Sequence, residues 1–320
     1  MRYFGCAGLF FFLLLVHGCG GHQPITEING TTIVPPADDE RVQQLLKAAQ
    51  TGDIETLNKI LSSGVDVDSA GHNGQTPLMV ACASGNKKAA DFLLNRGADP
   101  NAKQEDGATA LMLASGLGKT KIVQLLIEHQ AAINEVTNDG ISALMFASMK
   151  GSLEIAKMLI ARGADPNLVT KDGETALLTA AAEGYEEVMA FLIASEADIR
   201  AVDKSGQNAL MAAARNGHAG VVSLMLKHGI DVNASKSAGW TALMLAVGGG
   251  HYDATKTLLA AGADPLFSAS STIIRSALEK EMPAAAEEAR KPTPSVRSGF
   301  GLTSRTKMLS LLSRRMSIRA

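Results

Sequence analysis

The chain has 320 residues, of which 46% are hydrophobic and 19% are charged, a balance typical of a folded globular protein and not of a disordered one. With three cysteines and 4% aromatic residues, it can build no disulfide framework and must fold by packing small and aliphatic side chains. The formal net charge of −2 conceals an asymmetry, because residues 289–320 contain eight of the 30 basic residues and no acidic one. Residues 1–288 therefore contain 22 basic residues and all 32 acidic ones, so this part of the chain is acidic. Its negative charge, and the lack of a recognisable nucleic-acid-binding motif, argue against binding of nucleic acid.

The chain begins with an apolar run from Phe4 to Val16 that follows the basic residue Arg2. This run is shorter than the roughly 20 apolar residues that a membrane-spanning helix needs, but it suits the apolar core of a secretory signal. We therefore predict a signal peptide at residues 1–18. Residues 19–40 are polar and contain prolines, so we predict a flexible linker there.

The tetrapeptide Val16-His17-Gly18-Cys19 resembles the end of a bacterial lipoprotein signal peptide. Val16 and Gly18 fit that pattern, whereas His17 departs from it. The resemblance implies lipidation of Cys19 and anchoring to a membrane, with ordinary cleavage nearby as the alternative. We accordingly expect an exported protein, as a periplasmic or cell-envelope lipoprotein, and keep a secreted or a cytoplasmic protein as the alternatives.

The next 230 or so residues repeat themselves with a period of 33, the length of a common class of two-helix repeat. One series of glycines keeps this interval, and so do Leu78 to Leu243, Ala81 to Ala246 and a second glycine series from Gly85 to Gly250. The first glycine series is Gly74, Gly107, Gly140, Gly173, Gly206 and Gly239. Unbroken register over six units predicts six copies of one structural unit.

Each recurring position has a physical role in a helix-turn-helix unit. Asn-Gly or Asp-Gly pairs indicate turns, and Thr76 and its equivalents are suited to cap the helix that follows. A second helix then ends near a glycine such as Gly97 or Gly163. Gln130 and Glu196 stand where the other units have this glycine, which costs about 1 kcal/mol each if the backbone stays left-handed. We expect these two junctions to fray first.

The residues Asn73-Gly74-Gln75-Thr76-Pro77-Leu78, Ala81, Gly85 and Gly97-Ala98-Asp99-Pro100-Asn101 resemble the ankyrin repeat. The resemblance implies an all-α fold, an ankyrin-repeat solenoid of helix-turn-helix units joined by β-hairpin loops. We assign residues 41–71 to an N-terminal capping repeat, 72–270 to six repeats, 271–288 to a C-terminal capping helix and 289–320 to a basic, disordered tail.

One departure from the family pattern recurs along the chain. Methionine replaces the histidine that the family places after the capping threonine, proline and leucine, and we expect a softer contact between repeats as a result. The methionines are Met79, Met112, Met145, Met211 and Met244.

No set of residues in the sequence predicts catalysis, a metal site or a cofactor. Gly118-Lys119-Thr120 lacks the first glycine and the preceding strand of a phosphate-binding loop. Histidines one repeat apart, such as His218 and His251, are too widely spaced for one zinc ion, and Cys82 is predicted as a buried apolar residue. The Asp-Pro-Asn runs are interpreted as turns that cap themselves and not as calcium ligands.

The chain is therefore predicted to bind a protein partner through the concave surface that the resemblance implies, and not to be an enzyme. A membrane-tethered spacer or self-associating scaffold is the alternative function. Trp240 is either a binding residue or a shield of the last repeat junction, and the aspartates either attract a basic partner or only cap their turns. The candidate partner-binding residues are Trp240, Asp106, Asp139, Lys171, Asp172, Lys204, Tyr185 and Arg215.

Overall fold

The computed structural model describes residues 37–236 and 239–265. The predicted signal peptide, the lipidation candidate Cys19, the C-terminal capping helix at 271–288 and the basic tail lie outside the described residues. Most of the predicted linker lies outside them too.

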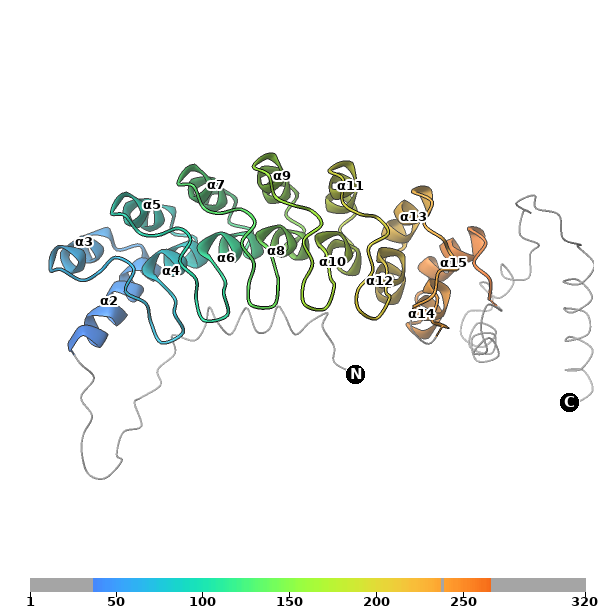
Figure 1. The fold of residues 1–320 in the computed structure, drawn as a ribbon, viewed down its shortest axis with the longest axis horizontal. Coiled ribbons are helices and arrows are strands. Elements are labelled where there is room, and N and C mark those ends of the chain that lie inside the picture. Colours follow the sequence, from blue (N-terminus) through green and yellow to red (C-terminus); the bar gives the residue numbers. More distant parts are fainter. Residues whose placement is uncertain (1–36, 237–238, 266–320) are drawn as a thin grey trace, which may run out of the picture. The chain divides into compact units, whose positions relative to one another are not determined.

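The described residues form fourteen helices arranged as seven antiparallel pairs (Figure 1). In each pair, the first helix has an even label and the second helix an odd one. The first helices are α2 (Ala37–Thr51), α4 (Pro77–Ser84), α6 (Ala110–Gly116), α8 (Ala143–Lys150), α10 (Ala176–Glu183), α12 (Ala209–Asn216) and α14 (Ala242–Gly248). The second helices are α3 (Ile54–Ser62), α5 (Lys87–Asn95), α7 (Thr120–Glu128), α9 (Leu153–Ala161), α11 (Glu186–Ala194), α13 (Ala219–Lys227) and α15 (Tyr252–Ala260).

Each helix contacts its partner in the pair and the helix of the same kind in the next pair. The first helices thus form one row and the second helices another, with a hairpin loop leading into each first helix from α4 onward (Figure 1). The predicted all-α repeat fold is confirmed. The hairpins contain no regular strands in the described segments, only isolated bridges such as Val136–Ser142.

Every first helix from α4 to α14 begins directly after the residue expected to cap it. The side-chain oxygen of Thr76, for example, accepts a hydrogen bond from the Met79 N–H at 3.4 Å, and Asn208 accepts one from the Met211 N–H at 2.9 Å. The same contact recurs at Thr109, Ser142, Thr175 and Thr241. These caps satisfy an N–H group that would otherwise be buried without a partner.

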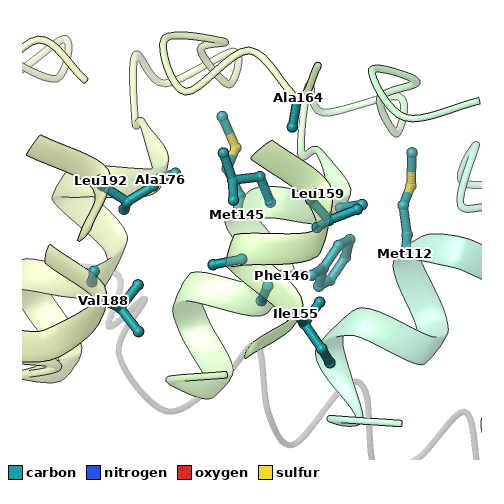
Figure 2. Close-up of a cluster of buried hydrophobic side chains, with 14 of the residues drawn as sticks. Met112, Met145, Phe146, Ile155, Leu159, Ala164, Ala176, Val188 and Leu192 are labelled. Atoms are coloured by element: carbon teal, nitrogen blue, oxygen red, sulfur yellow. The ribbon is translucent and has the colours of Figure 1, made fainter. Parts of the chain in front are cut away.

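The core is a continuous strip of leucine, alanine and methionine between successive pairs of helices. Met112 and Met145 are almost fully buried in it, and Met145 lies close to Leu159 of α9 (Figure 2). No repeat could bury these side chains alone, so each pair is stabilised mainly by its neighbours. The methionines thus fill the interior between repeats, and whether they soften the contact stays a prediction.

Helix α2 begins at Ala37, four residues before the expected start of the first repeat at residue 41. No helix among residues 37–236 and 239–265 is long and apolar enough to span a membrane.

Gln130 and Glu196 are the non-glycine residues with a positive φ in the described segments, at 61° and 64°. Both retain the left-handed turn that glycine makes after the other second helices, for example at Gly163 with a φ of 84°. The expected strain is therefore present at these two positions. It arises because a Cβ atom in this region crowds the following carbonyl oxygen.

We expect Gln130→Gly and Glu196→Gly each to raise the free energy of unfolding by about 1 kcal/mol. Urea denaturation followed by circular dichroism measures this change. Gln130→Ala is the control, because alanine removes the side chain but keeps the Cβ atom. A gain from the alanine variant equal to that from glycine would contradict the explanation by backbone strain.

Candidate functional site

The hairpin tips are joined to one another by backbone hydrogen bonds, which form a ladder along the repeats. Asn138 N donates to Asp106 O at 2.7 Å, and Lys171 N donates to Asp139 O at 2.8 Å. The next step, from Lys204 N to Asp172 O, is also 2.8 Å. Five of the eight candidate binding residues therefore lie on one connected row, although the sequence places them in different repeats.

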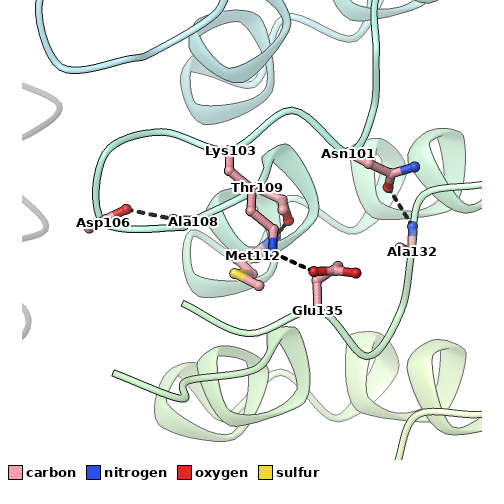
Figure 3. A network of polar contacts seen from close by, with 8 residues as sticks. All are labelled: Asn101, Lys103, Asp106, Ala108, Thr109, Met112, Ala132 and Glu135. Carbon is pink, nitrogen blue, oxygen red and sulfur yellow. Dashed lines mark hydrogen bonds and ion pairs between the residues drawn. The ribbon is translucent and has the colours of Figure 1, made fainter. Parts of the chain in front are cut away.

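The side chain of Asp106 caps its own hairpin. Its Oδ1 accepts hydrogen bonds from Ala108 N at 2.9 Å and from Gln104 Nε2 at 2.8 Å (Figure 3). The neighbouring loop is held by an ion pair between Lys103 and Glu135, 2.6 Å apart. The turn-capping interpretation of Asp106 is thus supported, while its exposed position leaves the other face of the carboxylate accessible.

Asp139 and Asp172 differ from Asp106, because within the described residues their carboxylates accept no hydrogen bond from their own turns. Asp139 Oδ1 lies 3.7 Å from Lys171 Nζ, and both side chains are mostly exposed. A pair this exposed contributes little to stability. Asp139, Lys171, Asp172 and Lys204 therefore present charges on the tips at little cost to the fold.

Trp240 lies at the base of the last described hairpin, directly before the cap of α14, and its side chain is 44% exposed. Its carbonyl oxygen accepts a hydrogen bond from Lys236 N at 3.0 Å, which closes the hairpin. The ring thus has substantial area open to solvent.

Tyr185 and Arg215 lie away from the tips, where a first helix ends and a second begins. Tyr185 is the N-cap of α11, and its ring packs over Gly151, so that a Cβ atom at Gly151 would lie 2.4 Å from it. Arg215 occupies the last turn of α12 with an exposed side chain. These two residues form a second candidate row, separate from the tips.

The electrostatics of these rows are acidic in the middle of the array. Loss of hydration raises the pKa of Glu174, and the carboxylates of Asp203 and Asp172 raise it further. Burial also raises the pKa of Glu183, although the nearby His218 acts in the opposite direction. A negative potential around α10 and its hairpin favours a partner with basic groups.

The sequence reasoning missed a set of side chains that join the repeats next to Tyr185. His218 Nε2 lies 2.9 Å from Ala182 O, and His251 Nε2 lies 2.9 Å from Arg215 O. Asn216 Nδ2 adds a bond to Ala182 O at 2.7 Å. Side chains near the start of the second helices thus supply hydrogen bonds between these repeats. The 33-residue interval between His218 and His251 was the sequence feature that could have predicted these contacts between repeats.

A second missed feature is an asparagine ladder in the loops that follow the second helices. Asn101 Oδ1 accepts from Ala132 N at 2.7 Å (Figure 3), and Asn134 Oδ1 accepts from Asp165 N at 2.9 Å. Asn167 and Asn233 repeat the contact to Asp198 N and Asp264 N. The asparagine of each Asp-Pro-Asn run therefore binds the next repeat, while its aspartate caps the local turn, as at Asp99 and Asn101.

We expect Asn167→Ala to lower the free energy of unfolding by about 1–3 kcal/mol, because two hydrogen bonds to the next loop are lost. These bonds run from Asp198 N to Asn167 Oδ1 at 2.7 Å and from Asn167 Nδ2 to Glu196 O at 3.1 Å. Urea denaturation measures the change, with Asp165→Asn as a control that keeps an acceptor for the local turn. An unchanged midpoint for Asn167→Ala would show that the ladder does not stabilise the array.

No group of three or more histidine, cysteine or acidic side chains is placed to hold a metal ion within residues 37–236 and 239–265. Cys82 is buried as predicted, and burial raises the pKa of its thiol well above the usual range. Such a thiol is a poor nucleophile because it stays protonated.

A family model described as "Ankyrin repeats (3 copies)" matches residues 45–137, 91–170, 131–203 and 177–268, which together span more than half of the chain. Among solved structures, the human ASB11 ankyrin repeat domain resembles the chain with a TM-score of 0.62 and 25% sequence identity. This similarity covers 68% of this chain and 96% of that domain. No curated protein sequence matches the chain.

Proposed function

The chain belongs to the ankyrin repeat family, whose repeats generally mediate protein–protein interaction, and from this premise we propose that it is a binding scaffold for a protein partner. The partner would lie on the hairpin tips and on the exposed ends of the first helices, which form the concave side in this family. The observation that carries the proposal is the backbone ladder from Asp106 to Lys204, because it holds the tips in a fixed arrangement before any partner arrives.

The acidic centre of the array supports a partner with basic groups. Asp139 and Asp172 are exposed, and the pKa of Glu174 is raised first by burial and then by the nearby carboxylates of Asp203 and Asp172. Trp240 supplies an exposed aromatic ring in the hairpin before α14, and tryptophan is among the residues most enriched at binding hot spots. Lys171, Lys204, Tyr185, Arg215 and Asp106 complete the proposed surface.

The experiment compares binding to the full chain and to the double variant Trp240→Ala/Asp139→Lys. Cell-envelope extract is passed over each bait, and the retained protein is then measured against purified baits by calorimetry. We expect the double variant to lose at least about 2 kcal/mol of binding free energy, roughly 30-fold in affinity.

The matched control is Tyr252→Ala/Asp253→Lys, which changes an exposed aromatic and an exposed aspartate on α15. The proposal requires that this control bind like the unchanged chain. If both double variants bind equally well, or if nothing specific is retained, a membrane-tethered spacer or self-associating scaffold becomes the better account.

We further propose that the protein is exported and anchored through Cys19, on the grounds of the N-terminal sequence alone. A Cys19→Ser variant should move from the membrane fraction to the soluble fraction of the source cell. If the Cys19→Ser variant divides between the two fractions as the unchanged protein does, Cys19 is not the anchor. The protein is then cleaved by ordinary signal processing, secreted or cytoplasmic.

A further inference from the structure

Three lines of hydrogen bonds occur between successive helix pairs, and the last of them is interrupted at one junction of the described repeats. The lines are the ladder of hairpin tips, the side chains near the start of the second helices, and the asparagine ladder in the loops after the second helices. The asparagine contacts follow the ends of the second helices, whereas the second line lies at their starts, so a junction that has both is held at both ends of its second helices.

The asparagine ladder is interrupted at Arg200, which occupies the position of Asn101, Asn134, Asn167 and Asn233. The Arg200 N–H donates the usual local hydrogen bond to Asp198 Oδ1 at 2.8 Å. Its side chain, however, makes no hydrogen bond to the loop that follows α13 in the part of the chain that the structure describes. The equivalent bond would reach Asp231 N, 31 residues further on.

The same junction is held firmly at its other edge. Asn216 Nδ2 and His218 Nε2, both next to the end of α12, converge on Ala182 O at 2.7 Å and 2.9 Å. The tip bond from Lys204 N to Asp172 O adds a third contact at 2.8 Å. The preceding junction differs, because Asn167 makes two bonds to the loop after α11.

The loop that lacks the contact also contains the strained residue Glu196, with its φ of 64°. The outer edge of this junction therefore combines backbone strain at Glu196 with the missing asparagine contact. Each feature lowers the cost of separating the two loops.

We propose that the junction between α10–α11 and α12–α13 is a hinge of the repeat array. The contacts at Ala182 and the tip bond at Asp172 form the axis, and the loops at 195–201 and 228–234 separate on the opposite edge. Hinges commonly use a few residues at the ends of helices to absorb such motion. This property concerns the shape of the array and is independent of the proposed binding function.

The test measures distances between spin labels at the last residues of second helices, in the full chain with Cys6 and Cys19 replaced by serine. Cys82 is buried and does not compete for the label. One pair, Ala161→Cys/Lys227→Cys, spans the proposed hinge. The matched pair, Glu128→Cys/Ala194→Cys, spans two junctions with intact asparagine contacts, and all four sites are exposed.

We expect a broader distance distribution for the pair that spans the hinge. Arg200→Asn should narrow it to the width of the matched pair, whereas Arg200→Ala should leave it broad, because alanine removes the arginine without supplying an acceptor. Equal widths for the two pairs in the unchanged protein would overturn the proposal. Equal narrowing by Arg200→Ala and Arg200→Asn, or no narrowing by Arg200→Asn, would overturn it as well.

Discussion

Replacing Gly140 by alanine is expected to lower the free energy of unfolding by about 2–4 kcal/mol, since two penalties act at one position. Gly140 has a φ of 84°, where a residue with a Cβ atom is strained. In addition, a Cβ atom there would lie 2.9 Å from Thr170 Cα and 3.0 Å from Val169 O, both in the backbone of the next hairpin. The tips would have to move apart to accept it.

Gly163 provides the matched control for this variant. It has the same φ of 84°, but a Cβ atom there would meet nothing within 4 Å. Gly163→Ala should therefore cost only the backbone strain, about 1 kcal/mol. Urea denaturation measures the free energy of unfolding of both variants, and the difference between them gives the cost of crowding the neighbouring hairpin. Equal losses of stability would show that the hairpin tips can move apart at no cost.

Leu159→Ala in α9 is expected to lower the free energy of unfolding by about 2–5 kcal/mol, because the cavity is only partly filled by relaxation. Leu159 is fully buried and lies near the middle of the array, beside Ile155 and Met145 (Figure 2). In a stack where each repeat contacts only its neighbours, a weakened middle repeat also uncouples the two sides. We therefore expect one cooperative transition to become two.

The same substitution at Leu57, also fully buried but in the first helix pair, tests the second part of this prediction. It should shorten the array from one end without dividing the rest into two parts. Calorimetry and circular dichroism report the number of transitions. A single transition for Leu159→Ala, with a loss below about 1 kcal/mol, would contradict the cavity argument.

The repeat period and the residue types at recurring positions were enough to predict the helix pairs, their caps and their left-handed ends. Thr76 and Asn208 cap helices because their side chains reach an N–H group within the same turn, and that contact depends on a few neighbouring residues. Glu196 was recognised as strained for the same reason, since its equivalents are glycine. The self-capping of the Asp-Pro-Asn turns was also predicted correctly.

The candidate binding residues were placed by repeat arithmetic, and the structure determined what their side chains do. Asp106 proved to cap its turn, while Asp139 and Lys171 face each other across two hairpins. The sequence could not distinguish these cases, because the two aspartates occupy equivalent positions in their repeats. The difference depends on which side chain the adjacent repeat brings near.

The sequence by itself thus determined the local architecture, because turns, caps and amphipathic helices depend on residues only a few positions apart. The tertiary structure decided which side chains hold one repeat to the next. His218 reaches Ala182, and Asn167 reaches Asp198, only after stacking brings together residues about 30 positions apart. The replacement of asparagine by Arg200 has the same origin. Its effect depends on stacking, because the asparagine oxygen would bind a backbone N–H, that of Asp231, 31 residues further along the chain.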